Sequence, residues 1–482
     1  MPLGLYISVP FCRTKCSYCN FASDVFSHAL FERYIERVCS DIQHAAQTAE
    51  QMGGRFQHTV ESIYLGGGTP SILDVNQLKR LFVNIWQYFD VQRGAEVTVE
   101  CAPGTLSEAV LQALLDCRVN RVSLGVQSFV DGEARAVGRL HNRATVLEEI
   151  ERLRKAGLPN INVDLIAGLP HQNVESWDIS LGDAIASGVP HVSIYMLEVD
   201  EDSRLGRELI AGGTRYHAHF VPDEDLTADL YTRACERLEA AGICQYEISN
   251  FARAGFESRH NLKYWTRQPY FGFGVDAHSM LWATGAEALV SGARDAGLKA
   301  RSSTAIQAAV EEASGPIHSS YGVGSELGPA ETQLPPQLPG PSHPPRTTVE
   351  GHGPSTSLRT NFSRAAGAPS DSGFSPCGPA VRFSTPDSLD AYMEGKRNGR
   401  TAVSQHAALE EAFFLGLRLT KGVDLQELEE QFSSESIASY AATITELREE
   451  HLLEGDGTII RLTPRGRLLS NEVFQRFIAV PA

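Results

Sequence analysis

The chain has 482 residues, of which 42% are hydrophobic and 21% charged, a composition typical of a folded globular protein with a large core. Its formal net charge of −17 argues against a general nucleic-acid binder, which needs a basic face for the phosphates. No apolar run is long enough to span a bilayer, and the first residues have the pattern of neither a signal peptide nor a transit peptide. Nine cysteines at irregular spacing do not indicate a disulfide framework, so we expect a protein of the reducing cytoplasm.

A short stretch near the start carries the first chemical signal. Cys12, Cys16 and Cys19 have the spacing C-x3-C-x2-C, which allows a tight loop to bring three thiolates to one metal centre. A structural zinc site is normally closed by four protein ligands, and no fourth Cys or His lies nearby at comparable spacing. Iron–sulfur clusters are held by Cys thiolates, usually four, so three would leave one iron open to a small molecule. The alternatives are a zinc loop completed by a distant His and three unconnected thiols.

Short β-rich runs alternate with segments of helical period from residue 5 to about 200. The predicted strands are 5–11, 62–65, 96–100, 121–126, 160–166 and 191–197. The predicted helices between them are 31–51, 75–89, 108–115, 144–156 and 176–186. Six strand–helix repeats indicate an α/β fold with a parallel sheet. Spacing alone does not separate a barrel from a doubly wound sheet.

Glycines and polar residues gather where these predicted strands end. The segment 66–70 (Gly-Gly-Gly-Thr-Pro) follows the second strand, and three glycines let the backbone approach a ligand closely, although a plain tight turn is the alternative. Glu100 ends the third strand, Gln127 follows the fourth, and Asp164 interrupts the apolar fifth. A carboxylate is costly to bury without partners. Glu100 and Asp164 are therefore either ligand-binding groups or members of a buried ion pair with an arginine such as Arg139 or Arg121.

The cysteine loop followed by G-G-G-T-P resembles the radical S-adenosylmethionine (SAM) family. The resemblance implies a partial (β/α)6 barrel over residues 1–200. It also implies a [4Fe–4S] cluster on Cys12, Cys16 and Cys19, whose open iron binds SAM. The residues that match the family's SAM contacts are Tyr6, Gly67, Gly68, Thr69, Glu100, Gln127, Arg139 and Asp164. Both one and two SAM molecules are compatible with this set.

Within that family the chain is similar to the oxygen-independent coproporphyrinogen III oxidase branch, and in that branch to the HemW-type haem chaperones. The similarity covers residues 1–292 and resumes from about 381. The oxidases carry a further cysteine two residues after the third cluster cysteine, and here that position is Phe21. Phenylalanine cannot supply a thiol. This departure, which the HemW type shares, argues against coproporphyrinogen III oxidase activity.

Residues 201–292 are expected to extend the barrel and to carry a haem motif. The stretch from His260 to Trp265 reads His-Asn-Leu-Lys-Tyr-Trp and matches the H-N-x-x-Y-W pattern of the HemW type. On its own, a His beside two aromatic residues is more often a packed surface feature than a haem ligand. The match favours His260 as a ligand of haem iron, with Tyr264 and Trp265 packing on the macrocycle.

The remaining chain divides into two parts. Residues 293–380 are rich in Pro, Gly, Ser and Ala and have no hydrophobic periodicity, so we expect a disordered insertion. Residues 381–482 carry helical patterns at 410–419, 424–431 and 436–450, followed by a β-hairpin and a last helix, which is the order of a winged helix. Acidic residues are frequent in this domain: Glu410, Glu411, Glu427, Glu429 and Glu430. They favour a lid or a docking surface over DNA binding.

These observations and the resemblance predict a cytoplasmic haem chaperone that binds a [4Fe–4S] cluster, SAM and haem, and delivers haem to acceptor haem proteins. If SAM is cleaved, the electron comes from an external donor of the flavodoxin or ferredoxin type, because no flavin-domain pattern is present. The alternative is a radical SAM enzyme of the coproporphyrinogen III oxidase type, acting in porphyrin biosynthesis. A third hypothesis is a DNA-binding regulator with a cluster sensor, and only the winged-helix pattern of the C-terminal domain supports it.

Overall fold

The computed structural model describes residues 1–201, 203–284 and 379–478. The insertion predicted at 293–380 lies outside the described residues except for its last two positions. Among the described helices, none combines the length and the apolar character needed to cross a membrane.

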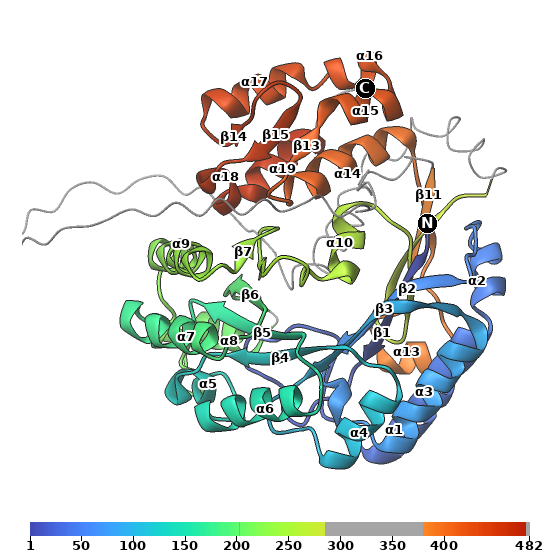
Figure 1. The fold of residues 1–482 in the computed structure, drawn as a ribbon, viewed down its shortest axis with the longest axis vertical. Helices are drawn as coiled ribbons and strands as arrows, with labels where there is room; N and C mark the ends of the chain where they lie inside the picture. The colour runs from blue at the N-terminus through green and yellow to red at the C-terminus, as the bar shows by residue number, and fades with distance from the viewer. Residues whose placement is uncertain (202, 285–378, 479–482) are drawn as a thin grey trace, which may run out of the picture. The chain divides into compact units, whose positions relative to one another are not determined.

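The centre of the fold is a parallel sheet built from the six predicted strands (Figure 1). They are β1 Leu3–Val9, β2 Thr59–Gly67, β3 Asp90–Cys101, β4 Arg121–Gln127, β5 Ile161–Ala167 and β6 His191–Met196. Each strand pairs in parallel with the next one in the sequence. The predicted α/β class with parallel strands is confirmed.

Further strands extend this sheet on both sides. Beside β6 lie β7 Cys244–Gln245 and β8 Asn250–Ala252, and beside β1 lie β9 Tyr270–Phe273, β10 His278–Trp282, β11 Ala380–Ser384 and β12 Arg400–Val403. In the described part of the chain the order is β12-β11-β10-β9-β1-β2-β3-β4-β5-β6-β8-β7. The sheet ends in β12 and β7 rather than closing on itself, which agrees with a partial barrel.

Helices connect the parallel strands and bury their apolar faces against the outer side of the sheet (Figure 1). They are α1 His28–Gln43, α2 Ala45–Gln51, α3 Val75–Tyr88, α4 Glu108–Asp116, α5 Asp131–Ala136, α6 Arg143–Lys155 and α7 Val174–Ala186. The turn after β2 continues as the 3₁₀ helix η1 Pro70–Ile72. One predicted helix, 31–51, is interrupted at His44 and forms α1 and α2.

The segment after β6 contains the helices that border the candidate site. They are α8 Arg204–Ala211, the 3₁₀ helix η2 Ala218–Phe220, α9 Glu224–Ala240 and α10 Arg259–Trp265. Helix α10 carries the H-N-x-x-Y-W motif. Its first backbone amides are capped by the carboxylate of Glu96 on β3, which accepts from Arg259 N and His260 N at 3.0 Å each.

The C-terminal part confirms the predicted winged-helix-like α+β arrangement. Its helices are α13 Leu389–Met393, α14 Gln405–Leu417, α15 Leu425–Phe432, α16 Ser434–Ala438, α17 Ala441–Glu449, α18 Pro464–Leu468 and α19 Ser470–Ile478. Its sheet has the order β13-β15-β14, with β13 Val423–Asp424, β14 Leu453–Glu454 and β15 Ile459–Leu462.

Two of the acidic residues of this domain are buried. Glu410 and Glu411 are 6% and 2% exposed. The carboxylate of Glu411 forms ion pairs of 2.7 Å with both Arg267 and Arg382. These two glutamates therefore do not contribute to an acidic surface, since most of α14 is buried.

Candidate functional site

The cysteine loop follows β1 directly and is closed by hydrogen bonds at its base. Cys12 N donates to Asp24 O at 3.0 Å, and the Lys15 ammonium donates to Phe21 O at 3.1 Å and to Ser23 O at 2.7 Å. The loop is therefore held as one compact turn. Phe21, the position at which the oxidases carry a cysteine, is 42% exposed.

The three thiols of this loop share one environment. The pKa of the Cys19 thiol is raised to about 11, first by burial and then by the neighbouring Cys16, and burial also raises the pKa of Cys12. Thr69 donates to Cys12 Sγ at 3.9 Å, and Arg139 donates to Cys16 Sγ at 3.4 Å. Thiols this shielded from water are suited to a cationic centre, which stabilises their thiolate forms.

The donor set fits an iron–sulfur cluster better than a single ion. In the described residues, no group of three or more His, Cys, Asp or Glu side chains is placed to hold one metal ion. Cysteines that hold a [4Fe–4S] cluster bind different irons and need not converge on a point.

The glycine turn after β2 packs against the strand that enters the cysteine loop. Gly68 N donates to Val9 O at 2.9 Å, and Thr69 N donates to Phe11 O at 2.8 Å. A Cβ on Gly68 would lie 2.7 Å from Phe11 O, and Gly67 has a φ of +101°. The absence of side chains lets the turn bring Thr69 beside Cys12.

Glu100, at the end of β3, faces this turn. Its carboxylate accepts from the Tyr64 hydroxyl at 2.8 Å and from the backbone of Gly67. Burial raises its pKa to about 7, and the nearby Asp164 contributes to the rise. Glu100 is thus poised between its charged and neutral forms near neutral pH.

Asp164 on β5 is held by neutral hydrogen-bond donors. Ser123 donates at 3.1 Å and the Asn162 amide at 2.7 Å, while burial raises the pKa of the carboxyl. The strand register places Glu100 beside Ser123 and Gly125 beside Asp164. Glu100 and Asp164 therefore lie on the two strands that flank β4. The hydrogen bonds described here come from neutral groups rather than from an arginine.

The end of β4 is irregular and carries two further predicted residues. Gln127 has a φ of +70°, and the register between β4 and β5 shifts between Gly125 and Gln127, which is the signature of a bulge. The Arg139 guanidinium donates to Gly125 O, and a Cβ on Gly125 would lie 2.9 Å from it. The glycine therefore makes room for Arg139.

The structure thus brings most of the predicted SAM residues to one end of the parallel strands, close to the cysteine loop, while Tyr6 and Asp164 lie in the middle of β1 and β5. Tyr6 lies within β1 and stacks on Tyr64, with ring centroids 6.2 Å apart. The sequence analysis missed supporting residues: Tyr18, Tyr64, Ser123, Gly125 and Asn162. The available signal was the alternation of polar residues in β2 to β5, which marks the inward face of a barrel.

His260 lies towards the other end of the strands. Its Nδ1 is 3.0 Å from the hydroxyl of Ser62 on β2, and its Nε2 is 2.9 Å from the hydroxyl of Tyr264. Ser62 precedes Gly67 by five residues, or about 16 Å along a strand. His260 is 1% exposed, and burial lowers its pKa to about 3. Both ring nitrogens are therefore engaged within the protein in this conformation.

Of the aromatic residues of the motif, Trp265 is buried and Tyr264 is partly exposed. Trp265 is 1% exposed, and the guanidinium of Arg418 lies 4.1 Å from its ring centroid. Arg418 forms an ion pair of 3.5 Å with the buried Glu247. The ring of Tyr264 meets that of Tyr270 edge to face, with centroids 4.7 Å apart. A haem that contacts His260 or Trp265 requires α10 to move from this position.

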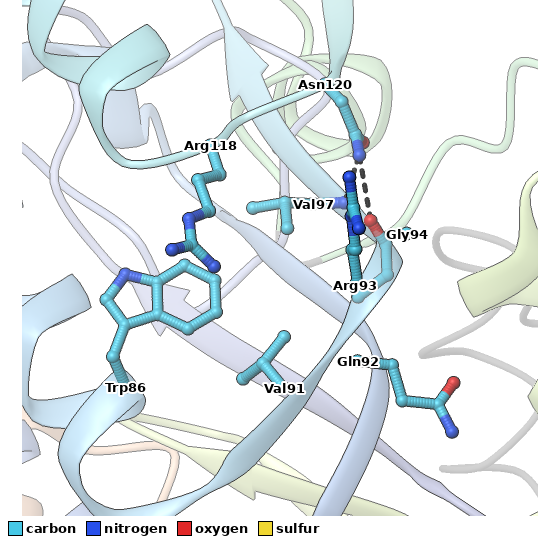
Figure 2. Close-up of a pocket in the computed structure, with 9 residues that line it drawn as sticks. Trp86, Val91, Gln92, Arg93, Gly94, Val97, Arg118 and Asn120 are labelled. Carbon is cyan, nitrogen blue, oxygen red and sulfur yellow. Dashed lines mark hydrogen bonds between the residues drawn. The ribbon is translucent and has the colours of Figure 1, made fainter.

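A groove of about 480 Å³ lies between α3 and the start of β3. Figure 2 shows the Arg118 guanidinium over the Trp86 ring, with 5.3 Å to the centroid, and Arg93 on the other side of Val97, near Asn120. None of the predicted cluster, SAM or haem residues lines this groove.

Comparison with known proteins gives this site a context. The family described as "Radical SAM superfamily" matches residues 6–183, and "HemN C-terminal domain" matches residues 403–469. The solved structure of coproporphyrinogen III oxidase (HemN) from Escherichia coli, a radical SAM enzyme, is similar with a TM-score of 0.69. The match covers 99% of this chain and 90% of that chain at 19% identity. The fold and the cysteine loop define a radical SAM protein.

Comparison with individual relatives shows to which family of radical SAM proteins the chain belongs. The heme chaperone HemW of Lactococcus lactis is 30% identical over 99% of this chain and 97% of its own length. The HemW of Bacillus subtilis is 29% identical over 98% of each chain, and that of Escherichia coli is 32% identical over 58% of this chain and 70% of its own. The chain belongs to the HemW-type haem chaperone family of radical SAM proteins.

Proposed function

We propose that this protein binds a [4Fe–4S] cluster, SAM and haem, and delivers haem to acceptor haem proteins. The observation that carries the proposal is the arrangement of Cys12, Cys16 and Cys19 beside the glycine turn and Arg139. It occurs in a chain that is similar over almost its whole length to proteins named heme chaperone HemW.

The residues around the cysteine loop have distinct roles in this proposal. The cluster, when bound to the three thiolates, supplies an iron with an open coordination position and a source of one electron. Gly67, Gly68 and Thr69 present backbone to SAM at close range. Glu100 and Asp164 offer carboxylate acceptors, and Arg139 supplies positive charge beside Cys16. Gln127 lies at the same end of its strand, and Tyr6 lies in the middle of β1.

The proposal includes His260 as a haem contact, with Tyr264 and Trp265 beside it. The motif match supports this role. Because both imidazole nitrogens of His260 are engaged and the ring is buried, ligation of iron through His260 requires separation of its ring from Ser62 or Tyr264. We therefore place this contact in an opened form of α10.

Two further features belong to the proposal. An electron for SAM cleavage comes from a separate flavodoxin-type or ferredoxin-type donor, and the protein acts in the cytoplasm. The oxidase alternative is not favoured, because Phe21 occupies the position of the additional cysteine and lies on the outside of the loop.

Anaerobic haem titration tests the proposal. The reconstituted protein is expected to bind one haem per chain, seen as a Soret band that saturates at one equivalent. His260→Ala is expected to weaken binding, whereas His58→Ala, an exposed histidine outside the site, is expected to leave it unchanged. Absence of saturable haem binding by the wild-type protein would overturn the proposed function.

A further inference from the structure

Two histidines form a pair at the same end of the strands as the cysteine loop. His171 lies four residues after the end of β5, and His217 immediately precedes η2. His171 Nε2 and His217 Nδ1 are 3.1 Å apart. The ring of Phe220 stacks on that of His171 with centroids 4.2 Å apart, and His171 N donates to Phe220 O at 2.8 Å. Two segments that are distant in sequence are thereby joined.

Hydrogen bonds fix each of these segments. On the first, the Gln172 side-chain oxygen accepts from Gly168 N at 2.6 Å. On the second, the Glu208 carboxylate accepts from Tyr216 N at 2.8 Å and Ala218 N at 3.2 Å. The pair is therefore positioned by its surroundings, which is what a preformed ligand site requires.

The pair leaves one imidazole lone pair open. Between two neutral histidines, one nitrogen donates and the other accepts. If His217 Nδ1–H donates to His171 Nε2, the lone pair on His217 Nε2 is directed away from the pair. This arrangement matches a metal-binding histidine, whose second ring nitrogen donates to a neighbouring acceptor that fixes its tautomer and orientation. The reverse tautomer opens His171 Nδ1, the nitrogen closer to the backbone and thus the more hindered one.

The number of donors indicates the kind of metal. A bare cation needs several protein ligands, and the described residues hold no group of three or more His, Cys, Asp or Glu side chains placed for one. A metal in a macrocycle brings four ligands and needs only an axial one. Apolar side chains are exposed on the adjoining elements: Phe220 at 56%, Leu209 at 47% and Ile210 at 67%. Such surface suits contact with a flat apolar molecule.

We propose that His217 Nε2 is an axial ligand of haem iron and that His171 is its positioning residue. This inference rests on the proposed haem-chaperone function. It places a haem contact beside the cysteine loop, because α8 is tied to that loop: Leu205 N donates to Ser17 O at 2.8 Å and Arg204 donates to Lys15 O at 3.1 Å. His260 is enclosed towards the other end of the strands between Ser62 and Tyr264. In this conformation His217 rather than His260 is therefore open to haem, and His260 contacts haem only in the opened form of α10.

Haem titration of variants of the full chain tests the assignment. His217→Asn suits this position because Asn tolerates the left-handed backbone, which His217 adopts with a φ of +61°. We expect this variant to bind haem at least about 10-fold more weakly, since loss of even an outer-shell partner of a metal ligand costs about that much, and to lose the signature of histidine ligation in its visible and EPR spectra. His219→Asn, an exposed neighbour outside the pair, is the matched control and is expected to behave as wild type.

The positioning role of His171 is tested by a separate measurement, the spectrum of the bound haem. His171→Ala is expected to alter the spectrum of the ligated haem, and His171→Gln, which retains a hydrogen-bond acceptor, is expected to restore it. A merely structural role would change the amount of folded protein and not the spectrum. If wild type binds haem and His217→Asn binds it with the same affinity and spectrum, the inference is overturned while the proposed function stands. If wild type binds no haem, both fail. Tight binding of Zn²⁺ alone that blocks haem and requires His217 would also overturn the haem assignment.

Discussion

The guanidinium of Arg139 donates a hydrogen bond to the sulfur of Cys16 over 3.4 Å, although 123 positions separate the two residues. The same guanidinium donates to Gly125 O at the end of β4. One side chain therefore connects the loop after β1 to a strand on the far side of β2 and β3. It also places a permanent positive charge beside a thiol that we propose as a cluster ligand.

Removal of this guanidinium is expected to weaken SAM binding. Hydrogen bonds to charged groups contribute about 1.5–3 kcal/mol, so Arg139→Ala should lower SAM affinity about 10-fold or more. Arg139→Lys keeps the charge but not the planar fork and should have an intermediate effect. Equilibrium binding to the reconstituted protein measures both. Arg135→Ala, an exposed arginine on α5, is the control, and wild-type affinity in Arg139→Ala would contradict the role.

The cluster assignment predicts a sharp difference among cysteines. Single Ala substitutions of Cys12, Cys16 or Cys19 should abolish the [4Fe–4S] absorption and reduce iron and sulfide content to background. Cys244→Ala should retain the cluster, because Cys244 is an exposed thiol outside the loop. Full iron content in any of the three loop variants would exclude that cysteine as a ligand.

The raised pKa of Glu100 predicts that the stability of the cofactor-free protein depends on pH. The pKa of Glu100 is raised in the folded state from an ordinary 4.5 to about 7, so the folded protein binds more protons than the unfolded chain between these values. Stability should therefore fall as pH rises from about 4.5 to 7. Glu100→Gln should remove this loss, which is about 3 kcal/mol at 1.36 kcal/mol per pKa unit, and be more stable than wild type at pH 8. Denaturant unfolding at pH 5 and pH 8 compares the two proteins directly.

A control is needed because the pKa of Glu410 is also raised to about 7 by burial. The difference between wild type and Glu100→Gln isolates Glu100, since Glu410 is present in both. An unchanged pH dependence in Glu100→Gln would show that the carboxyl titrates normally.

The buried pair of Glu247 and Arg418 predicts strong coupling between the barrel extension and the C-terminal helices. The two side chains are 0% and 1% exposed. Arg418→Met should destabilise the protein by about 3–5 kcal/mol, because it leaves an unpaired buried carboxylate. The double variant with Glu247→Gln should regain much of that stability. Additive losses in the double-mutant cycle, measured by denaturant unfolding, would contradict the coupling.

Much of the fold could be predicted because periodicity and strand spacing follow from local sequence. The six parallel strands and the winged-helix-like order are of this kind. Strands β9 and β13 were missed because they are short, at Tyr270–Phe273 and Val423–Asp424, and form by pairing with distant segments. A propensity pattern does not contain that information.

In the candidate site, too, features set by local sequence could be predicted and features set by distant contacts could not. The cysteines and the polar residues at strand ends could be named from spacing and resemblance, whereas their partners could not. That Tyr64 donates to Glu100, or that Gly125 makes room for Arg139, depends on strand register. The enclosure of His260 between Ser62 and Tyr264 likewise follows from where α10 packs, which a sequence motif does not specify.

The most direct test of the account is haem transfer. The reconstituted protein is loaded with one equivalent of haem under anaerobic conditions, separated from free haem, and mixed with an apo-haem protein, while a parallel sample is incubated with coproporphyrinogen III, SAM and a reductant. The account predicts that haem moves to the acceptor, seen as the acceptor's own Soret band, and that no protoporphyrinogen forms. Retention of haem together with SAM-dependent decarboxylation of coproporphyrinogen III would contradict it.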